Sequence, residues 1–555
     1  MPSLHNSLQP IMNLQTNILS YICLLASSRV DDWYYPATLR EISPEEDRSL
    51  HDILPSRSFA SFNLLCKRAR EIALASPRCW EDVLVVIQDN HVINGPSLLE
   101  QRLARSKSSP LNLFLCIKYP KNNSASHQRS AKTTVDQPNR KTAFELLTPH
   151  VRRFQHITIY NPGNYRRYHP VDTGEFLDLL SCSYPSLNQL TIIDHTSSTR
   201  RSSRQFDWYH FWAIGYKPNL ACVELAFSAH SGVFTTPRSL IAPPGVRRLR
   251  LQWGYSYCDV IAFLRQSPQL EHFDWDSFVP EEHFQMERSM MDRSKSTVLP
   301  SLLSLRLRRS APHPGAFMLV APKCEELYLH EVKDLWDEGP ISSRWNRLTL
   351  PQLKRFSVSR PTSDGSVGDD LLWDGMGGFL NRHQNLEDFI CYAPPENPFD
   401  DNHWRWPMAH VAYSLGPERQ APLLPDLNGT IAGPLPKLRT IWFEVDSNNW
   451  SSDLWPCLKD FIRAMLLSRP RLIVNLRAWP ITGYKEAGYY AGNGRWIFYP
   501  SYIEALANEI NQPREKREGM GADSSGRLNL LSADQAMTWP EAWGCIIPHT
   551  ASHIS

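Results

Sequence analysis

The sequence has little of what marks a secreted, membrane-spanning or metal-binding protein. Its 11 cysteines are scattered, and none forms the Cys-x-x-Cys pair of zinc sites and redox motifs. The odd count and the apolar surroundings of Cys23, Cys66, Cys116 and Cys391 indicate buried thiols in a reducing compartment. No window reaches the roughly 18 consecutive apolar residues of a membrane span. We therefore expect a cytoplasmic or nuclear protein, or one found in both, without membrane contact.

Strong charge and known catalytic motifs are also missing. The 59 Lys and Arg residues oppose 57 Asp and Glu residues, so the formal net charge is only +2 and no field favours nucleic acid. No G-x-S-x-G, H-E-x-x-H or phosphate-binding glycine loop is present. Neighbouring His and acidic residues arise often by chance, and we expect none of the following to be catalytic: Asp194-His195, His272-Phe273-Asp274 and Glu281-Glu282-His283. The sequence predicts no enzyme, no cofactor, no metal site and no nucleic-acid partner.

What the sequence does contain is a repeated apolar pattern. Residues 299–310, LPSLLSLRLRRS, reduce to Pro300 followed by Leu302, Leu305 and Leu307. The proline ends a helix or turn, the first leucine anchors the bend, and the last two share one face of a short strand. The same pattern begins at Pro185, Pro218, Pro244, Pro268, Pro322, Pro351 and Pro436, and a ninth copy has Gln384 in place of the proline.

The spacing of these copies favours a repeat architecture. Successive first apolar residues lie 33, 26, 24, 32, 22, 29, 33 and 52 positions apart, close to the roughly 20–29 residues of a leucine-rich repeat. One copy would mean little, but nine predict units that stack to cover each other's apolar face. The sequence thus resembles an irregular leucine-rich-repeat solenoid. We expect neighbouring parallel strands of one curved sheet at residues 186–193, 246–252, 302–308, 325–330 and 353–358.

Two basic clusters fall on these expected strands. Because strand side chains alternate between faces, we interpret them as solvated strand-face positions rather than as a nucleic-acid stripe. The clusters are Arg247, Arg248 and Arg250 in one copy, and Arg306, Arg308 and Arg309 in another.

The region before the repeats predicts two helices. Residues 12–26 place apolar side chains at helical spacing, and residues 58–76 do so again. The pair Ser76-Pro77 should end the second helix, because the residue before a proline is disfavoured in helical conformation. Trp80 then leads into a strand-like run at residues 83–87.

This arrangement resembles the F-box domain of fungal F-box proteins. The resemblance is carried by Leu65-Cys66-Lys67-Arg68-Ala69-Arg70-Glu71-Ile72-Ala73 and by Pro77-Arg78-Cys79-Trp80. It covers roughly residues 12–117 by motif and residues 150–480 by the looser repeat pattern. The family usually begins with Leu-Pro-x-Glu-Ile-Leu, whereas this chain has Gln15 and Asn17 at the proline and glutamate positions. It also has Ala69 where the family has a helical tryptophan.

The resemblance implies a non-enzymatic function. In that family the F-box docks on the Skp-type adaptor of an SCF-type cullin-RING ubiquitin ligase, and the repeats bind the substrate protein. The partners implied are therefore the adaptor with its cullin complex and an unidentified substrate. The adaptor-binding residues implied are Leu14, Ile18, Leu19, Ile22, Phe62, Leu65 and Cys66.

Two alternatives remain at this point. The chain could be a repeat scaffold outside any ligase, whose N-terminal helices only cap the array. It could instead be an enzyme of unfamiliar fold, which a deep pocket with converging polar groups would favour.

The fold class we expect is α/β, with a small N-terminal helical F-box-like unit followed by the solenoid, whose helices and loops lie on the convex side. We also expect disorder at residues 512–535, which are charged and rich in Gly and Ser. The predicted organisation is an F-box-like unit at 12–90, a connecting helix and strand at 91–117, a disordered excursion at 118–148, the solenoid at 149–480, and a C-terminal hairpin with a partly disordered tail at 481–555.

Overall fold

A computed structural model shows the arrangement of the repeats. The chain divides into two compact units, residues 1–246 with 538–555 (unit 1) and residues 247–537 (unit 2), and each is considered by itself. The structure describes residues 67–88, 91–92, 96–117, 143–161, 182–194, 217–227, 245–252, 257–277, 295–309, 311, 313–330, 332, 345–359, 379–380, 382–392, 435–446, 466, 471–479, 505, 507–508 and 527–531.

The first helix that the structure describes in unit 1 belongs to the segment that resembles an F-box. Helix α6, Lys67–Ala75, ends where the sequence predicts, and the Ser76 amide donates the last helical hydrogen bond to the Ile72 carbonyl at 3.0 Å. Proline has no amide to continue this series. A 3-10 turn, η2 (Pro77–Trp80), follows and leads within two residues into strand β1, Asp82–Gln88.

The strands of unit 1 are parallel, apart from β2, which pairs antiparallel with β1. Strands β1 and β3 belong to the same sheet as the later strands of this unit, so the parallel array begins well before the predicted boundary at residue 149. Helix α8 lies inside the segment 118–148, which we expected to be disordered. For the residues of this helix the expectation was wrong. The elements after β1 are β2 (His91–Val92), α7 (Pro96–Arg105), β3 (Leu111–Ile117), α8 (Ala143–Leu147), η3 (Thr148–Arg153), β4 (Phe154–Asn161), β5 (Gln189–Asp194) and β6 (Cys222–Phe227).

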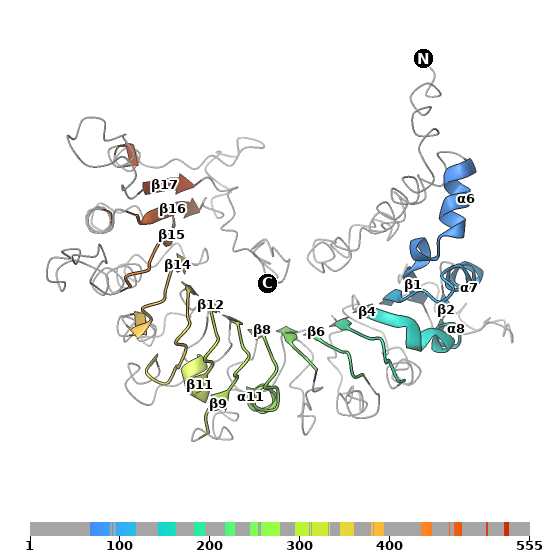
Figure 1. The fold of residues 1–555 in the computed structure, drawn as a ribbon, viewed down its shortest axis with the longest axis horizontal. Helices are drawn as coiled ribbons and strands as arrows, with labels where there is room; N and C mark the ends of the chain where they lie inside the picture. Colours follow the sequence, from blue (N-terminus) through green and yellow to red (C-terminus); the bar gives the residue numbers. More distant parts are fainter. Residues whose placement is uncertain are drawn as a thin grey trace, which may run out of the picture. The chain divides into compact units, whose positions relative to one another are not determined.

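Unit 2 contains nine parallel strands in one sheet, as far as the structure describes it, and they follow one another in chain order (Figure 1). Helix α11 contacts β9, which pairs with β11 in a separate small sheet on the same side of the strands. The elements are β7 (Arg248–Gln252), α11 (Tyr257–Arg265), β8 (His272–Ser277), β9 (Thr297–Val298), β10 (Ser304–Arg309), η4 (Pro314–Phe317), β11 (Leu319–Val320), β12 (Glu326–His330), β13 (Arg355–Ser359), β14 (Asp388–Tyr392), β15 (Thr440–Asp446), β16 (Ile473–Trp479) and β17 (Arg527–Leu531).

The strand register explains the apolar pattern of the sequence. Leu305 of β10 lies opposite Phe273 of β8 and Leu327 of β12, and Leu307 lies opposite Trp275 in the same way. Both leucines are at most 1% exposed. Because successive side chains alternate between faces, these paired positions form two continuous apolar rows on one face of the sheet. The expected parallel strands at the repeats are therefore confirmed within each unit.

In the copies whose proline the structure describes, the proline lies in a tight turn before its strand. The Leu302 amide donates to the Leu299 carbonyl at 3.3 Å, which places Pro300 second in a four-residue turn, where its fixed φ is favourable. In the ninth copy Gln384 takes this place, and the Leu386 amide still donates to the His383 carbonyl at 3.0 Å. Corresponding amides at Leu187, Leu220, Leu270, Cys324, Leu353 and Leu438 make the same bond.

Backbone hydrogen bonds also tie each turn to the repeat before it. The Leu303 and Ser304 amides both donate to the Glu271 carbonyl, at 2.7 and 3.1 Å. Lys354 and Arg355 share the Glu325 carbonyl in the same manner, each at 2.9 Å. Each shared carbonyl belongs to the residue that follows the apolar anchor of its own repeat. The strands themselves begin about two residues later than the sequence pattern suggests.

Strand β17 is one of the strands that the sequence reading missed. Strand β17 lies within residues 512–535, which we expected to be disordered, and it pairs in parallel with β16. Leu528 lies opposite Val474 and is fully buried, so it extends the apolar row. The composition of residues 512–535 is dominated by charged residues, Gly and Ser, and this hid the short apolar pattern of the strand.

We expect Leu305→Ala to lower the free energy of unfolding of the repeat array by about 2–5 kcal/mol, because it opens a cavity between adjacent strands. The loss should spread to neighbouring repeats, since each contacts only its neighbours. Hydrogen exchange across residues 270–330 measures it. Val298→Ala is the matched control, because Val298 is 49% exposed and its change should cost little. Unchanged exchange in the Leu305→Ala protein would contradict the stacking.

Candidate functional site

The face of unit 2 opposite the apolar rows carries a group of charged side chains. Between the two core residues of each strand lies one residue that points to this other face. In register across four neighbouring strands these residues are Arg250, Asp274, Arg306 and Tyr328. We use the name strand-face cluster for these four residues together with Asp276 and Arg308, which lie two positions further along β8 and β10.

One carboxylate at the centre of the cluster is shared by two arginines. Oδ2 of Asp274 lies 3.1 Å from Nη2 of Arg308 and 3.5 Å from Nε of Arg250. The Asp274 side chain is only 4% exposed. Burial by itself lowers the pKa of Arg308, but Asp274, Tyr328 and Asp276 outweigh it, so the pKa is raised overall. The arginine therefore stays charged in this setting.

Tyr328 lies near two arginines of β10, Arg306 and Arg308. The guanidinium carbon of Arg306 lies 5.9 Å from the centre of the Tyr328 ring, and that of Arg308 lies 5.8 Å from it. Both distances are within the range of a cation–π interaction. The ring thus holds two guanidinium groups near each other on one face of the sheet.

Our interpretation of the basic clusters was right for some arginines and wrong for others. Arg247 and Arg248 are exposed, as expected. Arg250, however, is 7% exposed, and the Arg308 side chain is 15% exposed. The reason is the neighbouring strand β8, whose Asp274 carboxylate draws both guanidinium groups against the sheet. Reading each cluster within its own repeat conceals this, whereas aligning the repeats on their apolar pairs places Arg250, Asp274 and Arg306 in one row.

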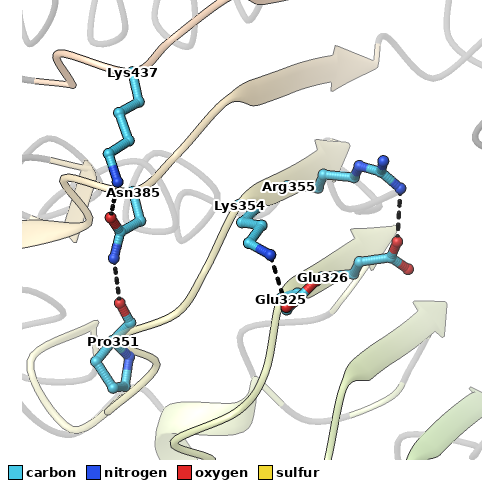
Figure 2. A network of polar contacts seen from close by, with 7 residues as sticks. All are labelled: Glu325, Glu326, Pro351, Lys354, Arg355, Asn385 and Lys437. Carbon is cyan, nitrogen blue, oxygen red and sulfur yellow. Dashed lines mark hydrogen bonds and ion pairs between the residues drawn. The ribbon is translucent and has the colours of Figure 1, made fainter.

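A second, more exposed set of charges lies where the strands begin. Figure 2 shows Nζ of Lys354 bonded to Oε1 of Glu325 at 2.7 Å, and Nη1 of Arg355 bonded to Oε1 of Glu326 at 2.8 Å. Arg355 also lies 3.3 Å from Asp388 on its other side. The Lys354 and Glu325 side chains are 42% and 46% exposed, so this pair should contribute at most about 1 kcal/mol.

Asn385 links three successive repeats in the same region. Its Nδ2 donates to the Pro351 carbonyl at 3.0 Å, and its Oδ1 accepts from Nζ of Lys437 at 2.7 Å (Figure 2). Asn219 donates to the Pro185 carbonyl of the preceding repeat in unit 1 in the same way. These contacts fix the turns relative to one another, whereas the strand-face cluster is the more buried charge group.

Of the His and acidic neighbours in the sequence, the structure describes the pair His272 and Asp274. His272 and Asp274 share a face of β8, but Asp274 binds Arg308 and Arg250 instead of the histidine. Within the described ranges no group of three or more His, Cys, Asp or Glu residues could hold a metal ion. His195 and the Glu281–His283 group lie outside those ranges.

The residues that the resemblance assigns to adaptor binding also lie outside the described residues. They are Leu14, Ile18, Leu19, Ile22, Phe62, Leu65 and Cys66.

The sequence matches no known family model, and no curated protein is similar to it. Among the helices that the structure describes, none is long and apolar enough to cross a membrane.

We expect Asp274→Asn to destabilise unit 2 by about 3–5 kcal/mol, because it leaves two buried arginines without their shared carboxylate. Urea unfolding of the full chain measures this loss. Glu325→Gln is the matched control, since its exposed ion pair should contribute less than about 1 kcal/mol. Equal effects of the two substitutions would show that burial of the cluster has no energetic consequence.

His272 should make stability depend on pH. Burial, followed by Arg248, lowers the pKa of His272 below its ordinary value of 6.5. The unfolded chain therefore binds a proton more readily than the folded chain, and stability falls as the pH drops below 6.5. Between about pH 7.5 and about pH 5.5, wild type should lose up to about 1.4 kcal/mol more than His272→Gln. Parallel pH profiles of the two proteins would contradict this.

Proposed function

We propose that this chain is the substrate-recognition subunit of an SCF-type cullin-RING ubiquitin ligase. Its N-terminal unit would dock on the Skp-type adaptor, and its repeats would bind the substrate protein. The observation that carries the proposal is the continuous run from α6 through η2 into β1. The segment that resembles an F-box forms a helix, stops at Pro77 and enters the parallel array directly.

Packing around Trp80 supports a rigid connection between this segment and the repeats. The guanidinium carbon of Arg105, on α7, lies 4.7 Å from the centre of the Trp80 ring. Cys79 beside it is 3% exposed. A partner bound through helix α6 would therefore be held in a defined position relative to the first strands of unit 1.

Helix α6 itself presents a surface to solvent. Leu74 is 40% exposed, and Lys67, Arg68 and Glu71 are exposed as well. An exposed leucine among charged residues is compatible with a partner surface, although a single such residue is also common on monomers.

The mechanism of such a subunit is proximity. Binding the substrate on the repeats and the adaptor on the N-terminal unit raises the local concentration of substrate lysines near the conjugating enzyme. No side chain of this chain then needs to take part in the chemistry.

The packing of Cys79 and Trp80 also favours a second candidate function. A helical segment fixed on the first strands covers the end of an apolar array, as terminal caps of repeat proteins do. In that case the chain is a protein-interaction scaffold outside any ligase.

We expect Phe62→Asp to abolish capture of a Skp-type adaptor while the thermal transition of the repeats stays unchanged. Apolar anchors at protein interfaces contribute on the order of 2 kcal/mol or more each, and an unpaired carboxylate among them adds a desolvation cost. A pull-down with adaptor from the native cell measures the effect, with wild type tested first.

Gln269→Asp is the control for the added charge, because Gln269 is exposed in a turn of unit 2, far along the chain from the F-box-like segment. It should leave adaptor capture intact. If wild type captures no adaptor at micromolar concentration, the ligase role is excluded and the scaffold takes its place.

A further inference from the structure

The strand-face cluster contains more positive than negative charge. Its three arginines, Arg250, Arg306 and Arg308, face two aspartates, which leaves an excess of +1. The Asp274 carboxylate is already shared by two of the arginines. Arg306 contacts the Tyr328 ring but forms no ion pair or hydrogen bond with any described residue. The excess charge is therefore concentrated at Arg306.

Hydrogen-bond donors without acceptors surround this excess charge. Nε of Arg308 has no partner, and neither have the hydroxyl groups of Ser304 and Ser357. Both serines are at most 1% exposed. Ser304 lies two residues before Arg306 on the same face of β10, and Ser357 lies opposite Tyr328 on the next strand. These three groups are buried, as is the unsatisfied Oδ1 of Asp274, so a ligand from solvent meets the guanidinium of Arg306 instead.

We propose that Arg306 and Arg308, with Tyr328 between them, form a subsite for a single carboxylate. Guanidinium groups bind planar carboxylates through paired charge-assisted hydrogen bonds. One carboxylate carries one negative charge, which neutralises the excess of the cluster. A phosphate group would bring up to two charges next to Asp274 and Asp276 and would be repelled by them.

The carboxylate belongs to an aspartate or glutamate side chain of the substrate protein, an assignment that rests on the proposed function. The face offers a route for such a side chain at Arg306, which is partly exposed, whereas Arg250 and Asp274 lie beneath. Of the charges at the start of the strands, Glu326 and Arg355 are paired with each other, whereas Arg248 is exposed at the start of β7. Within the strand-face cluster, an acidic residue approaching this face meets Arg306 as the partly exposed arginine that makes no ion pair with a described residue.

The test measures binding of labelled peptides to the purified full chain by fluorescence anisotropy. Short peptides of Gly, Ser and Ala carry a central run of Glu, Gln or phosphoserine, so that one acidic group can enter the subsite in any register. We expect the Glu peptide to bind at least about tenfold more tightly than the Gln peptide. This preference should weaken as salt concentration rises.

Variants assign the binding to the cluster. Arg306→Gln should weaken binding of the Glu peptide at least about tenfold. Arg306→Lys keeps the charge without the planar fork and should lie between wild type and Arg306→Gln. Arg347→Gln is the matched control, because Arg347 is exposed in a turn of the same unit outside the strands, and it should bind like wild type.

Three results would overturn the proposal. They are equal binding of Glu and Gln peptides, equal effects of Arg306→Gln and Arg347→Gln in a folded chain, and a phosphoserine peptide that binds about tenfold more tightly than the Glu peptide. Adaptor capture is measured separately. Arg306-dependent peptide binding without adaptor capture retains the subsite and excludes the ligase role, whereas adaptor capture without peptide binding does the reverse.

Discussion

No strand of this protein can bury its apolar pair alone. Leu305 and Leu307 are covered because β8 and β12 present Phe273, Trp275 and their counterparts in register. The parallel stacking, the turns before each strand and the shared carbonyls all serve this one requirement. The turn at Pro300 places the anchoring leucine, Leu302, in the core. The Glu271 carbonyl of the preceding repeat then accepts hydrogen bonds from the amides of Leu303 and Ser304. Hydrophobic burial and backbone pairing thus act on the same few residues of every repeat.

The strict alternation of side chains has a second consequence on the opposite face. Whatever lies between two core positions must point away from the core, so Arg250, Asp274 and Arg306 are brought into one row although they come from three repeats. The buried charge pair between Asp274 and Arg308 is weak evidence for stability, because desolvation offsets much of the attraction. It fixes the positions of the guanidinium groups instead, which is what recognition of another charged group requires.

Sequence alone predicted the parts of the fold that depend on local pattern. The Pro300, Leu302, Leu305 and Leu307 pattern predicted a turn and a parallel strand, since each inference needs only the spacing of a few residues. The Asp274–Arg308 ion pair could not be found in this way, because its partners are 34 residues apart and meet only through strand register. Strand β17 was missed because its leucines are few and its flanking residues are polar. The adaptor-facing residues, from Leu14 to Cys66, remain predictions.

The spacing between repeats varies far more than the register does. First anchors lie from 22 to 52 residues apart, yet the strands of unit 2 remain paired residue for residue. The free energy of closing a connecting segment rises only slowly with its length, so long insertions between repeats cost little. Connecting segments of this chain can therefore be lengthened or shortened while the strand face stays intact. Within this one chain, the length of the connecting segments and the geometry of the strand face vary independently.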